Sequence, residues 1–120
     1  MAPIAVRVSL PGHLRRLAGI AEREVVVDVP STGDRPITLG MLLDAVERTY
    51  PALRGTLRDY PQTGSTAPGA LRPFIRFFAV EQDLTPAGQS GPLPPEVVAG
   101  SDVLRVIGAI AGGERDRQTR

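Results

Sequence analysis

The sequence predicts a single α+β domain in which a mixed sheet of four to five strands curls around one main helix. Three observations support this fold class: alternating apolar residues near the start, one amphipathic helical stripe in the middle, and an apolar run near the end. With 120 residues and 42% apolar side chains, the chain can form one modest core but not two.

Two strands are expected first, because residues 4–10 and 24–29 each alternate between apolar and polar or small side chains. Pro11 and Gly12 end the first strand, and residues 14–21 are interpreted as a short connection that carries arginines. We expect the two strands to pair in antiparallel fashion.

The main helix is predicted to follow Thr38, a suitable N-cap, and to stop at Pro51. Its core face consists of Leu39, Leu42, Leu43, Val46 and Tyr50, and its solvent face of Asp44, Glu47 and Arg48. Pro51 can also begin a short helical turn. In that turn Leu53 and Leu57 are expected to face the core, and Arg54 and Arg58 the solvent.

The second half of the chain contains two further predicted strands. Residues 74–80 have the strongest β character, with three aromatic side chains, and residues 103–110 form the final apolar run. Residues 62–70 are interpreted as a flexible loop and residues 85–95 as an irregular crossing loop. If the first and last strands are central and parallel, this order is the β-grasp, or ubiquitin-like, arrangement. Other α+β sandwiches fit the pattern almost as well.

The composition argues against several classes of function. The chain has no cysteine and a single histidine, His13, so neither a metal centre nor a catalytic triad is expected; His13 is interpreted as a solvated turn residue. A net charge of +1 with scattered arginines argues against nucleic-acid binding. No apolar stretch is long enough for a membrane span or signal peptide, so a cytoplasmic location is expected.

Several segments resemble one family. The first is Val6-Arg7-Val8, and the second is residues 38–43 leading into Tyr50-Pro51-Ala52-Leu53. The phenylalanine-rich strand from Phe74 follows, and the last segment is Gly100-Ser101-Asp102-Val103 with a final strand and Gly112-Gly113. In this order they resemble the small sulfur-carrier proteins of the MoaD/ThiS type, which are relatives of ubiquitin.

The resemblance implies a carrier that is not itself an enzyme. Family members have their terminal glycine carboxylate adenylated by a ubiquitin-activating-type adenylyltransferase, which binds the ATP and Mg; the carrier itself holds no cofactor. The carboxylate then becomes a thiocarboxylate that donates sulfur to a synthase. Gly113 would hold the reactive carbon, and Gly112 would keep the tail thin and flexible. The acceptor pathway, whether for a cofactor, an amino acid or a specialised metabolite, is left open.

The chain departs from most of the family because Glu114 and six further residues follow Gly113. An internal glycine has an amide where activation needs a carboxylate. Some relatives are precursors trimmed by a JAMM-type zinc metalloprotease, so we expect a domain over 1–113 and a tail over 114–120, cleaved between Gly113 and Glu114. Alternatively, the tail is permanent and the chain is a non-catalytic ubiquitin-like interaction module.

The resemblance also implies a docking surface on the exposed sheet face beside the last strand. Either Arg76 and Phe78 or their neighbours Ile75 and Phe77 should be exposed there, because side chains alternate along a strand. Arg105 is unusual among the aliphatic residues of the last strand. Arg76, Phe78 and Arg105 are therefore the candidate partner contacts.

Overall fold

The computed structural model describes residues 3–60, 64 and 69–108, and these form the predicted α+β fold. Five strands form one mixed sheet in the order β2-β1-β5-β3-β4. β5 runs parallel to β1, whereas the other neighbouring strands are antiparallel. The elements are β1 (Ile4–Ser9), α1 (Gly12–Ala18), β2 (Glu24–Val29), α2 (Leu39–Thr49), η1 (Pro51–Leu53), β3 (Ile75–Ala79), β4 (Gln82–Asp83), η2 (Thr85–Ala87), α3 (Pro95–Val98) and β5 (Leu104–Gly108).

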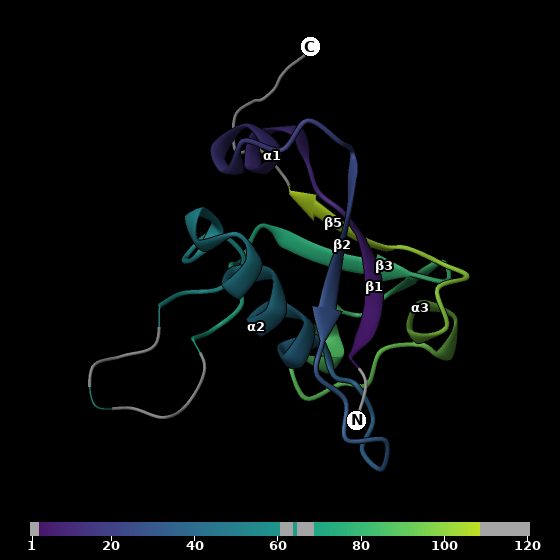
Figure 1. Ribbon diagram of the computed structural model, residues 1–120. Helices are drawn as coiled ribbons and strands as arrows, with labels where there is room; N and C mark the ends of the chain where they lie inside the picture. The colour runs from purple at the N-terminus through teal and green to yellow at the C-terminus, as the bar shows by residue number, and fades with distance from the viewer. Residues whose placement is uncertain (1–2, 61–63, 65–68, 109–120) are drawn as a thin grey trace.

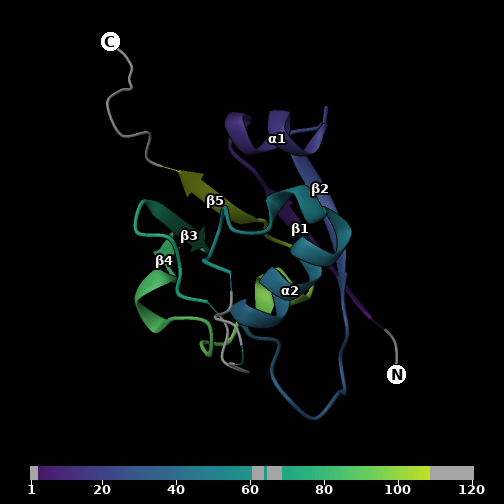
Figure 2. The same cartoon turned by 90° about the vertical axis from the view of Figure 1, so that its left-hand side faces the viewer.

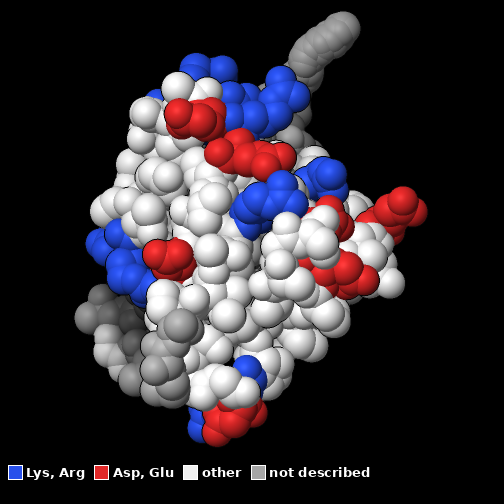
Figure 3. Space-filling view, turned by 45° about the vertical axis from the view of Figure 1, so that its right-hand side comes forward, with Lys and Arg blue, Asp and Glu red and all other residues white. Residues whose placement is uncertain are grey.

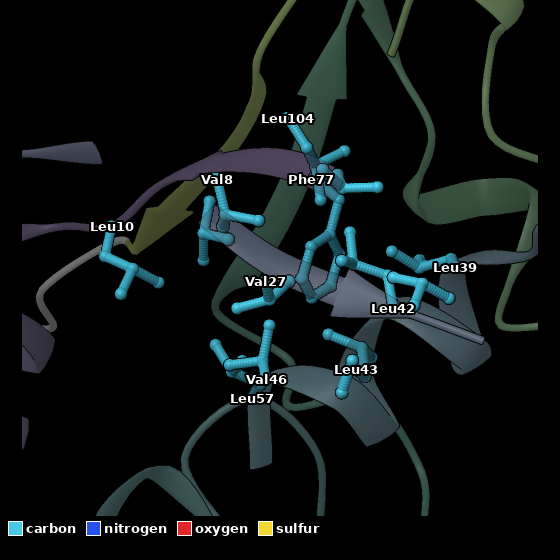
Figure 4. Close-up of a cluster of buried hydrophobic side chains, with 14 of the residues drawn as sticks. Val8, Leu10, Val27, Leu39, Leu42, Leu43, Val46, Leu57, Phe77 and Leu104 are labelled. Carbon is cyan, nitrogen blue, oxygen red and sulfur yellow. The ribbon is translucent and has the colours of Figure 1, made fainter. Parts of the chain in front are cut away.

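The sheet wraps around α2, which covers one of its faces (Figure 1 and Figure 2). Val6, Val27 and Phe77 reach the helix from three different strands and are fully buried or nearly so. Figure 4 shows the ring of Phe77 among side chains of β2 and α2. The predicted core face of α2 is confirmed for Leu39, Leu42, Leu43 and Val46, whereas Tyr50 is half-buried at the end of the helix.

The start of α2 is fixed by its own cap and by the segment before α3. The Thr38 hydroxyl accepts a hydrogen bond from the backbone N–H of Met41 at 3.2 Å, which confirms the predicted N-cap. The Gly40 N–H donates to the Gln89 carbonyl at 2.8 Å. A β-carbon on Gly40 would lie 3.1 Å from that carbonyl oxygen, so glycine allows the close crossing.

The connection predicted over 14–21 is wrong in one respect, because most of it is the helix α1. Leu14 is buried on its inner side, and the helix ends at Gly19, whose φ of 71° suits glycine. His13 is therefore a half-buried helical residue and not a turn residue. A helix of seven residues is marginal alone and depends on packing, which explains why a local pattern missed it.

The prediction that Arg58 faces solvent is also wrong. Arg58 is only 7% exposed and donates two hydrogen bonds to Glu47, at 3.0 and 2.9 Å, and one to Gln89 at 2.8 Å. A further ion pair joins it to Asp44. Burial alone would lower the pKa of Arg58, but the hydrogen bonds that Arg58 donates to Glu47 and Asp44 outweigh this effect and raise that pKa. Glu47 is thus partly buried on the face of α2 that was expected to be solvated.

The crossing loop predicted over 85–95 is more ordered than expected, because it contains η2 and the first residue of α3. Before it, β3 and β4 form a hairpin whose two turn residues, Val80 and Glu81, have φ values of 52° and 59°. Positive φ is unfavourable for a β-branched residue such as Val80. The Asp102 carboxylate accepts a hydrogen bond from the Val80 N–H at 2.8 Å, which helps to hold this conformation.

Candidate functional site

The outer face of the sheet, opposite α2, carries the three candidate partner residues. Along β3, Ile75 and Phe77 are buried, so the exposed pair is Arg76 and Phe78, with Phe78 partly covered. Along β5, Arg105 is exposed between buried neighbours. The alternation of the two strands therefore places all three on one surface.

Strand register brings these residues side by side. Phe78 lies opposite Arg105, and Arg76 lies opposite Ile107, which is 47% exposed. Phe74, just before β3, is 60% exposed. We call this set the outer patch: Phe74, Arg76, Phe78, Arg105 and Ile107. Exposed aromatic and aliphatic side chains interleaved with arginine are typical of protein-binding surfaces.

Sequence reasoning did not identify Phe74 and Ile107. A signal for Ile107 was available, because it lies two residues after Arg105 and therefore shares its face of the strand. The same signal was available for Phe74, which lies two residues before Arg76 in the predicted strand over 74–80.

The arginines of the outer patch are held only loosely. Arg76 lies 3.7 Å from Asp83, and Arg105 lies 3.9 Å from Asp102, with both guanidinium groups about half exposed. Exposed pairs of this kind contribute about 0–1 kcal/mol. The two guanidinium groups can therefore contact a partner at little cost to the domain.

Asp102 connects the patch to the hairpin. Its carboxylate accepts hydrogen bonds from the N–H groups of Val103 and Val80, both at 2.8 Å, and these bonds lower the pKa of Asp102. Asp83 similarly accepts hydrogen bonds from the hydroxyl and N–H of Thr85, which lower its pKa. These carboxylates are positioned by backbone N–H groups and, for Asp83, also by the Thr85 hydroxyl, and they help to order the edge of the outer patch.

Gly108 is the last described residue of the central strand β5. His13 of α1 packs against this point: a β-carbon on Gly108 would lie 2.9 Å from the His13 Cε1. Gly112, Gly113 and Glu114, the predicted sites of activation and cleavage, lie outside the described residues. Figure 3 shows arginine and acidic side chains gathered at the upper end of the molecule in that view.

Within the described residues, no three His, Asp or Glu side chains gather into a possible metal site. An open apolar depression at the opposite end is lined by Pro3, Pro30, Ser31, Thr32 and Met41 and has no charged side chain in its lining. Among the helices that the structure describes, none combines the length and apolar character required to cross a membrane.

Comparison with known proteins gives matches in structure only. No protein-family profile matches the sequence, and no curated protein matches it significantly. Small archaeal modifier protein 1 from Haloferax volcanii is 24% identical, with 91% of this chain and 99% of that chain covered and a TM-score of 0.62. Small archaeal modifier protein 1 from Methanosarcina acetivorans is 18% identical, with 94% and 100% covered and a TM-score of 0.67.

A chain from the BexX/CysO complex of Amycolatopsis orientalis is also similar. It is 24% identical, the alignment covers 91% of this chain and 100% of that chain, and the TM-score is 0.60. These likenesses extend over nearly the full length of each protein. The chain therefore has the ubiquitin-like β-grasp fold, which it shares with these small archaeal modifier proteins and with the matched chain of the BexX/CysO complex.

Proposed function

We propose that this chain is the precursor of a ubiquitin-like sulfur carrier that acts in the cytoplasm as a protein cosubstrate and not as an enzyme. The observation that carries the proposal is the place of β5. The described part of this central strand reaches Gly108, which precedes Gly113 by five residues in the sequence, and the outer patch lies beside it. A partner that docks on the patch can thus receive the segment that contains the diglycine. The likeness of fold to modifier and carrier proteins supports the same proposal.

In the proposed reaction, a JAMM-type metalloprotease first hydrolyses the bond between Gly113 and Glu114. The freed Gly113 carboxylate attacks the α-phosphorus of ATP on an adenylyltransferase, which binds the ATP and Mg, and pyrophosphate leaves. Hydrosulfide then attacks the acyl carbon, AMP leaves, and the product is a thiocarboxylate that a synthase uses as its sulfur source. This chain contributes the carboxyl carbon and the docking surface.

Glycine at positions 112 and 113 fits this role, because a residue without a β-carbon can adopt any backbone conformation and enter a narrow channel. Within this proposal Arg76, Phe78 and Arg105 contact the adenylyltransferase. Arginine can form bidentate hydrogen bonds to carboxylates, and Phe78 provides apolar contact area between them.

The test is ATP–pyrophosphate exchange with the adenylyltransferase of the same organism. We expect exchange with a chain that ends at Gly113, and none with the full 120-residue chain. A chain that ends at Glu114 is the matched control, since it has a free carboxylate displaced by a single residue. Equal exchange by all three would contradict the assignment of Gly113 as the reactive group.

The second candidate function is a non-catalytic interaction module. It is favoured by one observation: seven residues follow Gly113, so its carbonyl belongs to an amide in the chain as given. If this alternative holds, none of the three chains supports exchange. Intact mass of the protein from its native host gives an independent measurement, because the precursor proposal requires a species that ends at Gly113.

A further inference from the structure

The helix α1 lies at the end of the molecule where β5 ends, as both ribbon views show (Figure 1 and Figure 2). Leu104 and Val106 face the core, and Gly108 continues this alternation on the side of the helices. His13 of α1 closes over Gly108 from that side. Gly108, the last described residue of β5, is therefore bordered by the outer patch on one face of the sheet and by α1 on the other.

The solvent-facing part of α1 combines two arginine side chains with an exposed leucine. A β-carbon on Gly12 would lie 3.4 Å from a terminal guanidinium nitrogen of Arg15 and 3.5 Å from one of Arg16, so the two guanidinium groups converge on one point. Arg15 is also anchored by a hydrogen bond from its Nε to the Leu10 carbonyl at 3.1 Å. Beside them Leu17 is 55% exposed.

Neither Arg15 nor Arg16 has a carboxylate within ion-pair distance in the described part of the chain. Two guanidinium groups held close together repel each other, and an anion placed between them relieves this repulsion. Paired arginines of this kind suit planar oxyanions, which they can bind through two parallel hydrogen bonds. An adjacent leucine fits a protein surface better than a free small anion.

We propose that the α1 surface, formed by His13, Arg15, Arg16 and Leu17, is a second docking site for the adenylyltransferase, which meets it with a carboxylate-bearing segment and an apolar contact. This inference rests on the proposed function. The outer patch holds one side of the departing chain, and α1 holds the other. With a single contact, the carrier could still rotate on the enzyme. Two contacts on opposite faces of the sheet fix its orientation and therefore the direction in which the chain enters the enzyme.

The experiment uses the chain that ends at Gly113 and measures the KM for the carrier in ATP–pyrophosphate exchange. Arg16→Glu brings a negative charge close to the enzyme's carboxylates, which repel it. This variant is expected to raise KM about fivefold to tenfold and to leave kcat within about twofold of the unchanged chain. Arg35→Glu is the matched control, because Arg35 is exposed in the loop between β2 and α2 at the other end of the molecule (Figure 1). It makes the same change in charge and should leave KM within about twofold.

Ionic strength separates the two parts of the contact. The difference in KM between the unchanged chain and Arg16→Glu should shrink as salt rises from about 0.05 to about 0.5 M, since exposed charges are screened over a few ångströms at the higher value. Leu17→Ser should raise KM by an amount that salt does not reduce. Melting temperatures of the variants verify that α1 remains folded.

Three outcomes overturn the inference, and they are distinguishable. If the unchanged chain supports exchange and Arg16→Glu has the same KM, α1 is not a docking site, although the proposed function stands. If Arg16→Glu lowers the melting temperature of the full chain and leaves the KM of the chain ending at Gly113 unchanged, the arginines pair with the acidic residues of the tail and not with the enzyme. If no chain ending at Gly113 supports exchange, the proposed function fails and the inference fails with it.

Discussion

The buried cation Arg58 gives the sharpest test of the structure, because its burial contradicts what its local sequence suggests. Arg58→Met removes the guanidinium group and leaves Glu47, whose side chain is only 16% exposed, without its two hydrogen bonds. Removing one member of a buried ion pair costs about 3–5 kcal/mol, because the remaining charge is left uncompensated. Total stability for a domain of this size is about 5–15 kcal/mol, so the loss is large.

The assay is equilibrium unfolding in urea. Small domains lose about 1–3 kcal/mol of stability per molar urea, so the Arg58→Met midpoint should fall by at least about 1 M. Asp44→Asn is the control within the same cluster: its side chain is 62% exposed, and its pair with Arg58 should contribute no more than about 1 kcal/mol. The loss of unfolding free energy should therefore depend on how deeply the removed charge is buried, and not simply on the number of charges removed.

A double-mutant cycle between Arg58 and Glu47 isolates their interaction. We expect Glu47→Gln to cost about 1.5–3 kcal/mol on its own, and the two positions to couple by about 0.5–3 kcal/mol. An unchanged midpoint for Arg58→Met, or additive effects in the cycle, would show that Arg58 is solvated and that the contacts with Glu47 and Gln89 do not persist in solution.

Further predictions concern the core, the pH dependence and the diglycine. Leu42→Ala should cost about 2–5 kcal/mol, because Leu42 is fully buried beneath the sheet; an unchanged urea midpoint would place α2 on the surface. Asp102 has a folded pKa below its ordinary value of 3.8, so its contribution to stability is present above that value and is lost as pH falls through the lowered pKa. Asp102→Asn should therefore lower the melting temperature at pH 7 and reduce its fall below about pH 4. Gly112→Ala and Gly113→Ala should keep the melting temperature and reduce pyrophosphate exchange; a drop of several degrees would indicate a structural role for these glycines.

The regular elements of the fold could be predicted because their signals are local. The alternation of apolar and polar residues over β1 and β2 indicates strands with one buried face. The apolar helical stripe and the Thr38 cap indicate α2. Both patterns follow from backbone geometry within a few residues. The same alternation established that Arg76 and Phe78 share one face. It could not establish which face is exposed, since that depends on where α2 packs.

The sequence by itself therefore determined β1, β2, β3 and β5, the main helix and their order, but not the short strand β4. The tertiary structure decided the parts that depend on contacts between distant residues. Arg58 is buried because Glu47 and Gln89, 11 and 31 residues away, converge on it. The outer patch arises from the pairing of β3 with β5, and the α1 surface from the packing of His13 on Gly108. Periodicity records which side of an element is apolar, whereas ion pairs and strand pairing are set by the spatial arrangement of segments far apart in the chain.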